Sequence, residues 1–167
     1  MHPRRVASGH SSSLCQDATW TARFDPEQNR LFRRMSPQEQ GHALAVLATL
    51  HRMGYSEPVL DQAALLHDAG KMGGNIRLWH RVLTVLLQSL SPGLLLRIAR
   101  EEPGSWRYPF FVQADHAVRG AQMAAQVGAD AQAVALIRWH HTPPRETDLD
   151  APGQALLAAL RAADDQN

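Results

Sequence analysis

The stretch AALLHDAGK, residues 63–71, carries the strongest signal in this chain. It joins an apolar run to the adjacent pair His67 and Asp68, which is followed by Gly70 and Lys71. An imidazole beside a carboxylate offers two ligands that suit Fe, Mn, Zn, Co or Mg better than metals that prefer thiolates. Two neighbouring ligands do not make a site alone. The pair therefore predicts a metal site only if further ligands occur elsewhere in the chain.

Further ligand types do occur, in an ordered series on both sides of the pair. They are His42 before it and His116, His140, His141 and Asp164 after it. The resulting seven candidates are too many for one catalytic ion, which usually has three or four protein ligands. They fit two ions that share a bridging carboxylate. Two such ions, roughly 3.5–4 Å apart, can activate a bridging water and stabilise both sides of a displacement at phosphorus.

The spacing of apolar residues predicts an all-α fold. Ser36 and Glu39 form a capping box with Pro37 between them, so we expect a helix from there to about Met53, ended by Gly54. Further helices are expected over 58–69, 76–90, 94–100, 110–127, from Asp130 to about His140, and over 152–163. No segment shows period-two alternation. A ligand set spread over these helices requires a bundle with the site in its core.

Composition limits the classes of protein to consider. A length of 167 residues predicts one domain, here 25–167, behind a Ser-rich and basic flexible tail over 1–24. A net charge of +1 gives no overall attraction to nucleic acid. Cys15 stands alone, which excludes an internal disulfide and a cysteine-based zinc site. We see no signal-peptide core and no bilayer-spanning run, so we expect a cytoplasmic protein without a membrane partner.

The order His, His-Asp, His, His-His, Asp resembles the HD-domain superfamily of metal-dependent phosphohydrolases over roughly residues 28–167. The pieces that carry this resemblance are GHALAVLATL, AALLHDAGK, HAVRGAQMAAQVG, IRWHH and LRAADD. It implies the helical bundle of an HD domain. It also implies that His42, His67, Asp68 and Asp164 hold one ion, while Asp68 bridges to a second held by His116, His140 and His141. Fe or Mn is expected, with Zn, Co, Ni or Mg as alternatives.

The resemblance implies hydrolysis of a phosphate ester or anhydride in a nucleotide or another small phosphorylated metabolite, through a metal-activated water. Asp68 and Lys71 would be catalytic, and Lys71 and Arg81 would bind the substrate. Arg77, Arg81 and Arg119 are basic groups near the motifs that could bind substrate phosphate, although salt bridging or solvation is the more common role for any one of them. The HD-GYP branch has a Gly-Tyr-Pro loop after its His-His pair. Residues 142–146 lack it, so cyclic-dinucleotide hydrolysis is not expected.

The sequence is also compatible with other functions, with a dimer and with different positions for some side chains. The same ligand order can hold the iron pair of an HD-type di-iron oxygenase, or a metal in a non-catalytic sensor or scaffold. A homodimer is also open, because the apolar helix expected over 76–90 could offer a dimer surface. Trp79 is expected in the core, whereas the aromatic run 106–111 could wall a pocket or belong to the core. His141 could meet solvent or substrate instead of a metal.

Overall fold

The computed structural model describes residues 24–167, except for the side chains of Leu78, Arg81, Gln88 and Pro92. The tail expected over residues 1–24 therefore lies outside the described residues apart from Phe24. The substrate-binding role expected for Arg81 also concerns a side chain outside the description.

Within residues 24–167 every regular element is a helix, and no strand occurs, which confirms the all-α prediction. The α-helices are α2 (Pro26–Arg34), α3 (Pro37–Arg52), α4 (Pro58–Leu66), α5 (Leu78–Leu90), α6 (Pro92–Ile98), α7 (Tyr108–Gln126), α8 (Ala131–Trp139) and α9 (Ala151–Asp164). Two short 3₁₀ helices, η1 (Ala69–Lys71) and η2 (Pro144–Glu146), complete the set. None of the helices in the described part of the chain is long and apolar enough to cross a membrane.

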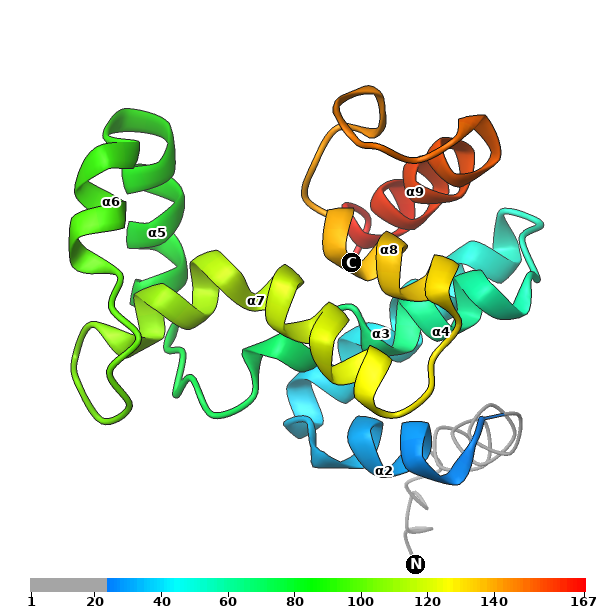
Figure 1. The fold of residues 1–167 in the computed structure, drawn as a ribbon, viewed down its shortest axis with the longest axis horizontal. Coiled ribbons are helices and arrows are strands. Elements are labelled where there is room, and N and C mark those ends of the chain that lie inside the picture. Colours follow the sequence, from blue (N-terminus) through cyan, green and yellow to red (C-terminus); the bar gives the residue numbers. More distant parts are fainter. Residues whose placement is uncertain (1–23) are drawn as a thin grey trace, which may run out of the picture.

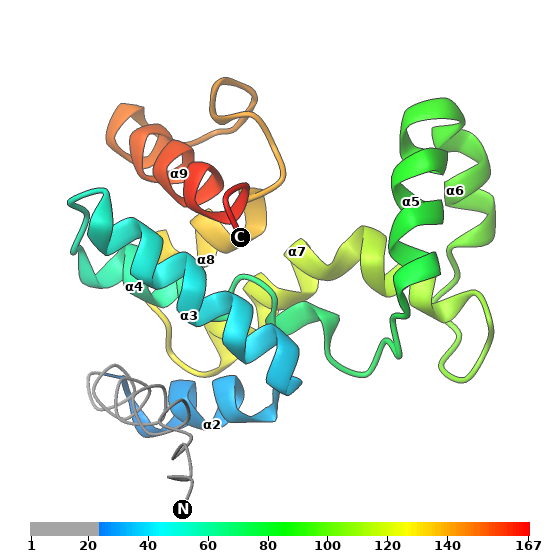
Figure 2. The same ribbon diagram turned by 180° about the vertical axis from the view of Figure 1, so that it is seen from behind.

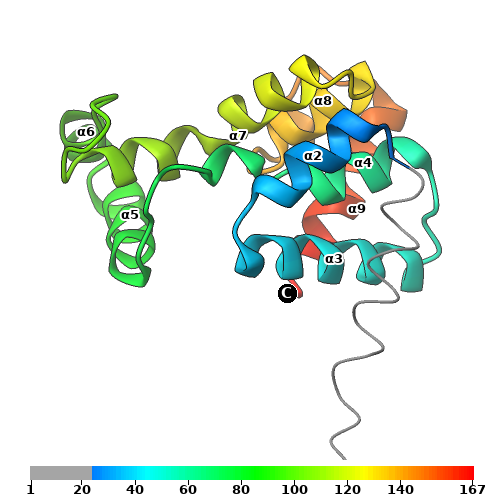
Figure 3. The ribbon, with the colours of Figure 1, turned by 90° about the horizontal axis from the view of Figure 1, so that it is seen from below.

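The helices form a bundle with a hairpin beside it. Helices α2, α3, α4, α8 and α9 gather around one part of α7, while α5 and α6 stand apart at the other end of α7 (Figures 1 and 3). The view from behind shows the same separation (Figure 2). The largest fully buried aliphatic side chains, among them Leu47, Leu60, Leu66, Leu136 and Leu160, belong to the bundle. The core is thus built on the side where the expected ligands lie.

Local signals set the helix ends. The Ser36 hydroxyl accepts from the Glu39 amide and the Glu39 carboxylate accepts from the Ser36 amide, which confirms the capping box at the start of α3. Gly54 follows the helix with a φ of +92°, a conformation that favours glycine. The Asp130 carboxylate accepts from the Gln132 amide at the start of α8, as expected. Satisfying the free amides of a first turn stabilises these helices by about 1 kcal/mol each.

Two helix predictions need correction. Helix α4 ends at Leu66 instead of continuing to Ala69, because the backbone of Asp68 leaves α-helical geometry (φ −94°, ψ 2°) and the chain tightens into η1. Helix α2 was not expected, although Asp25 caps it and Pro26 occupies its first position. Those two residues are a recognised helix-start signal, but the helix that follows them is short.

The expectation that Trp79 belongs to the core is wrong, since 50% of its surface is exposed. The inward positions of α5 are taken by the buried His80 and Thr84. The Trp79 ring lies beside the buried residues, with its centroid 3.7 Å from that of His80 and 5.8 Å from that of Phe110. Phe110 is fully buried and so resolves to the core, whereas Trp106 is exposed.

Candidate metal centre

The His67–Asp68 pair lies at the junction of α4 and η1, both residues being buried. The segment η1 packs directly on α7. Gly70 permits this, because a Cβ built there would overlap the backbone carbonyl of His116 and approach the amide nitrogen of Gly120 to 2.6 Å. The close approach brings Asp68 Oδ1 to 3.7 Å from the Nε2 atom of His116. A glycine in the motif thus joins ligand candidates that are far apart in sequence.

Three buried histidines share one orientation. The Nδ1 atom of each lies within hydrogen-bond distance of the backbone carbonyl three residues earlier: 2.8 Å from His67 to Ala64, 2.8 Å from His116 to Gln113 and 2.6 Å from His140 to Ile137. A neutral imidazole has one donor nitrogen and one acceptor nitrogen. Since a carbonyl can only accept, Nδ1 donates and the Nε2 lone pair is left to face the site. Metal-binding histidines are held in this way by their other ring nitrogen.

Two of these Nε2 atoms, in His67 and His140, are buried and have no hydrogen-bond partner. A buried polar atom without a partner destabilises the fold by about 1–3 kcal/mol, so its presence calls for an explanation. A divalent cation explains both atoms, because a neutral imidazole nitrogen is one of the commonest metal ligands. The donor set therefore fits the metal that the sequence predicts.

One group of donors gathers between α3, α4 and α9. Ligand atoms of His42, His67 and Asp68 lie within 4.8 Å of one another. Asp164 joins them, with its Oδ1 atom 2.8 Å from His42 Nε2 and 3.6 Å from His67 Nε2. Two ligand atoms that are each about 2.1 Å from one ion lie roughly 3–4 Å apart. The 3.6 Å separation of Asp164 Oδ1 from His67 Nε2 fits such an arrangement. The 2.8 Å separation of Asp164 Oδ1 from His42 Nε2 is that of a hydrogen bond.

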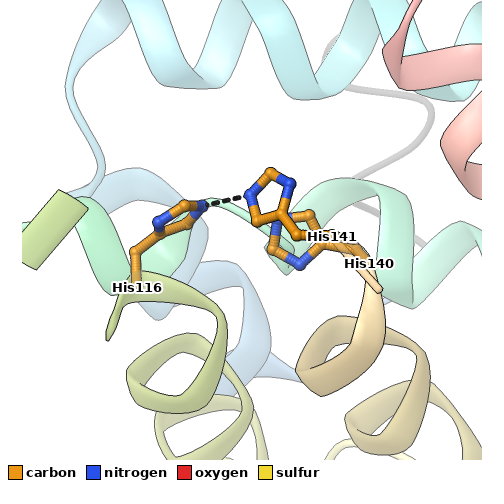
Figure 4. Close-up of side chains that lie close together, drawn as sticks. All are labelled: His116, His140 and His141. Carbon is orange, nitrogen blue, oxygen red and sulfur yellow. Dashed lines mark hydrogen bonds between the residues drawn. The ribbon is translucent and has the colours of Figure 1, made fainter. Parts of the chain in front are cut away.

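A second group joins α7 to the end of α8. His116 extends from α7 toward His140 and His141, which follow α8 (Figure 4). The ligand nitrogens of all three lie within 4.8 Å of one another. The Nε2 atoms of His116 and His141 are 2.8 Å apart, the contact drawn as a dashed line in Figure 4. His141 is exposed, yet its ring faces the group.

Asp68 lies between the two groups. Its Oδ1 atom is 3.7 Å from the Nε2 atoms of both His67 and His116, and its Oδ2 atom is 4.0 Å from His42 Nε2. A carboxylate with one oxygen directed at members of both groups has the position that a bridging ligand requires. The structure thus brings together all seven residues that the sequence singled out.

The ionisation states of the site residues favour the binding of a cation. Burial alone would raise the pKa of Asp68, but His67 and Lys71 hold it well below its usual value. Burial likewise opposes ionisation of Asp164, whereas the hydrogen bond with His42 and the nearby ring of His67 lower its pKa strongly. Both carboxyl groups therefore stay ionised down to low pH. Burial, followed by the charge of Lys71, lowers the pKa of His116 to about 3, which keeps that ring neutral.

His140 and His67 differ in the balance of the same effects. Burial and the neighbouring His141 lower the pKa of His140 well below its ordinary value. Burial also opposes protonation of His67, but Asp68 and Asp164 outweigh it and raise the pKa of that ring. The two carboxylates therefore attract positive charge to the position of His67 Nε2. A cation would supply that charge.

Lys71 connects the site to solvent. Its ammonium donates to Asp68 Oδ2 at 2.6 Å. Two adjoining clefts share Lys71, Gln38 and Glu39 in their walls. The smaller, of about 460 Å³, also contains His42, Asp68, Ala45, Asp164 and Asn167. The larger, of about 620 Å³, also contains Arg34, Ser36, Met72, Gly73, Asn75, Ile76 and Arg77.

The other basic candidates are distributed unequally. Arg77 lines the larger cleft, as a substrate-binding role would need. Arg119 instead donates to the Met72 carbonyl at 3.4 Å and lies over the Tyr108 ring, so its described contacts are structural. Arg34 and Gln38 line the clefts although the sequence did not single them out. Exposed polar residues outside a motif give no signal that could have found them.

His51 and His80, which stand outside the ligand order, also lie outside the site. His51 Nε2 is 2.8 Å from the Asp61 carboxylate, a contact between α3 and α4. His80 Nδ1 accepts from the Arg77 amide at the start of α5. Both rings therefore have structural contacts.

The chain was also compared with known proteins. The family model described as HD domain matches residues 40–165, which is most of the chain. Neither the curated proteins nor the solved structures gave a match. The matched segment begins just before His42 and ends just after Asp164, and it spans every ligand candidate described above. The chain therefore belongs to the HD domain family, a superfamily of metal-dependent phosphohydrolases.

Proposed function

We propose that this protein hydrolyses a phosphate ester or anhydride of a small phosphorylated metabolite, with nucleotides among the candidates. The observation that carries this proposal is the pair of partnerless, buried Nε2 atoms of His67 and His140, whose ring centroids lie 5.3 Å apart, with Asp68 beside His67. Such donors fit divalent cations, and the family consists mainly of hydrolases that use them. Two bound cations would supply an activated water and would stabilise charge on the phosphoryl oxygens.

The protein side chains would position these components. His42, His67, Asp68 and Asp164 form one ligand group, and His116, His140 and His141 form the other, with Asp68 between them. The backbone carbonyls behind His67, His116 and His140 keep the Nε2 atoms directed inward. Lys71 would donate to a substrate phosphate oxygen, since it lies at the junction of the two clefts. A lysine ammonium recognises such an oxygen as a point charge.

The larger cleft supports a polar substrate. Its walls contain Arg34 and Arg77 along with the uncharged polar groups of Gln38 and Asn75. A phosphoryl group over Asp68 and Lys71 would leave the remainder of the molecule in this cleft, facing hydrogen-bond donors and positive charge. These groups suit a phosphate-bearing or hydroxyl-rich metabolite.

The test begins with metal content. Protein purified without a histidine tag or added metal is analysed for its elements and then assayed on a panel of phosphate monoesters, diesters and nucleotides. About two equivalents of Fe or Mn together with hydrolysis supports the proposal. Oxygen consumption by the ferrous protein without hydrolysis supports the di-iron oxygenase instead. Protein that takes up no metal on reconstitution would overturn the proposal and favour a scaffold.

A further inference from the structure

Helix α5 has an apolar face that nothing in the described structure covers. The side chains of His80 and Thr84 point inward and are buried. The opposite pattern holds for Trp79, Val82, Leu83, Leu86 and Leu90, all of which are exposed, and which we call the apolar stripe. Its members recur every three or four residues, and the pairs 79/86 and 83/90 are seven apart. That spacing places them along one side of the helix, as in helix–helix seams.

The stripe lies on the part of the molecule that stands apart from the bundle. The hairpin of α5 and α6 extends from the end of α7 (Figures 1 and 3). A shallow apolar groove of about 710 Å³ follows the stripe and is lined by Arg77, Trp79, Val82, Leu83 and Leu86. On helix α6, Leu94 and Leu96 are also exposed, and since they lie about 200° apart around that helix only one of them can extend this surface. The hairpin therefore presents a hollowed apolar surface.

The size of this surface identifies what could cover it. Taken with ordinary side-chain areas, the exposed fractions of the stripe and of one of these two α6 leucines amount to roughly 600 Å². The largest apolar patch on a typical monomer is roughly 300–600 Å². Two copies that bury this surface against each other would remove roughly 1,200 Å² from water, which reaches the lower end of the roughly 1,200–2,000 Å² of stable interfaces. One further copy of the same surface thus meets the requirement.

We propose that this protein forms a homodimer in which the hairpins of two copies pack through the apolar stripe. In a two-fold dimer the same patch serves both partners, and the two α5 helices would run antiparallel about a point between Leu83 and Leu86. Arg77, at the start of one α5, would then lie beside the C-terminal end of the other. The carbonyls there carry partial negative charge, so this alignment would give the Arg77 guanidinium, which borders the groove, a favourable electrostatic partner.

The distribution of charge favours a second copy over a membrane. Helices that lie on membranes combine an apolar face with many cations on the opposite face. Helix α5 has one cation within its bounds, Arg81. The stripe also begins at Trp79, next to the buried Phe110 of α7, and is not confined to the hairpin tip. A face that is apolar along the whole helix suits packing against another helix.

The dimer would also border the candidate active site. Arg77 lines both the apolar groove and the larger of the two clefts beside Lys71. A second copy on the stripe would therefore stand next to one wall of that cleft. Dimerisation does not depend on the proposed hydrolysis, because it is tested by the mass of the particle in solution and not by activity.

The experiment compares two neighbouring positions on α5. Leu86 lies in the groove, whereas Val85 is exposed but does not line it. Consecutive residues differ by about 100° around a helix. In sedimentation velocity at micromolar concentration, the unmodified chain is expected at twice 18.5 kDa. Leu86→Glu is expected to raise the dimer dissociation constant by about a hundredfold or more, while Val85→Glu leaves the mass unchanged.

Circular dichroism of both variants verifies that each has kept its helices. As a second measurement, Leu83→Cys in a Cys15→Ser background should form an intermolecular disulfide on mild oxidation, and Val85→Cys should not. A monomeric unmodified protein would overturn the proposal, as would equal masses for the two glutamate variants. Monomer that sediments with vesicles of phosphatidylcholine and phosphatidylglycerol would assign the stripe to a membrane instead.

Discussion

The backbone of Gly70 lies directly against the backbone of His116, with no room for a side chain between them. This contact joins η1 to the middle of α7. It thereby sets the 3.7 Å separation of Asp68 Oδ1 and His116 Nε2, the shortest described link between the two ligand groups through a carboxylate. The Gly70 position thus controls both stability and the geometry of the site.

Gly70→Ala should therefore destabilise the fold. A Cβ there would overlap a backbone atom that cannot rotate away, so we expect a loss of about 2–4 kcal/mol in the free energy of unfolding. Urea denaturation measures this loss. Gly41→Ala is the matched control, since a Cβ at Gly41 meets nothing within 4 Å and lies on a helix. That control should gain up to about 1 kcal/mol, and equal effects at both positions would contradict the packing argument.

Asp68 and Lys71 should separate metal binding from catalysis. Asp68→Ala removes the carboxylate between the two ligand groups, so it should lose most of the metal and reduce hydrolysis by about three orders of magnitude or more. Lys71→Ala should retain the metal and lose rate by about a hundredfold, because one charge on the phosphoryl group is missing. Elemental analysis and steady-state assays measure both. Full metal content and activity in Asp68→Ala would refute the site.

His140 should decide the number of ions. Its Nε2 atom has no other described partner, so His140→Gln should reduce the metal content from about two equivalents to about one. His51→Gln is a suitable control, because glutamine can still donate to Asp61 and His51 lies outside both ligand groups. Elemental analysis of the two purified variants makes the comparison. An unchanged stoichiometry in His140→Gln would exclude this ring as a ligand.

The metal-free protein should lose stability as the pH falls. The pKa of His116 is lowered from 6.5 to about 3 and that of His140 well below 6.5, so below pH 6.5 only the unfolded chain takes up these protons. Protons bound more by the unfolded state favour unfolding. For His116 alone the loss is about 1 kcal/mol between pH 6.5 and 5.5. His67 acts in the opposite direction, since its pKa is raised, and offsets part of the loss.

Urea denaturation in the presence of a chelator, at pH 7.5, 6.5 and 5.5, tests this prediction. The His116→Asn variant should show a smaller decrease over the same range, because it lacks one of the groups. Stability that stays constant or rises toward pH 5.5 would show that the buried rings do not remain neutral in the folded protein.

The sequence was informative where the local chain determines the structure. The capping box at Ser36 and the glycine after α3 predicted that helix to within a residue at each end, because both signals act within one turn. The ligand order was predictable for another reason: the identities of His42, Asp68 and Asp164 are chemical requirements that do not depend on packing. Their convergence in space agrees with that expectation.

Other features depend on contacts between distant segments and could not be predicted. Trp79 is exposed because the buried face of α5 carries His80 and Thr84, and an apolar pattern does not show which face of a helix will be buried. The early end of α4 follows from the packing of η1 on α7. Arg34 reaches the cleft from α2, a helix whose start signal is present but whose position beside Lys71 is set by tertiary structure.

The short contact between Lys71 and the Oδ2 atom of Asp68 makes the lysine a competitor of the cations for this carboxylate. An anion that draws the ammonium into the cleft frees that oxygen, and a cation on Asp68 frees the ammonium in turn. Binding equilibria coupled in this way are reciprocal. Phosphate and divalent cation should therefore increase each other's affinity for the site. Without either of them, Lys71 neutralises the charge of Asp68, and the same lysine would bind the substrate phosphate once a cation is bound.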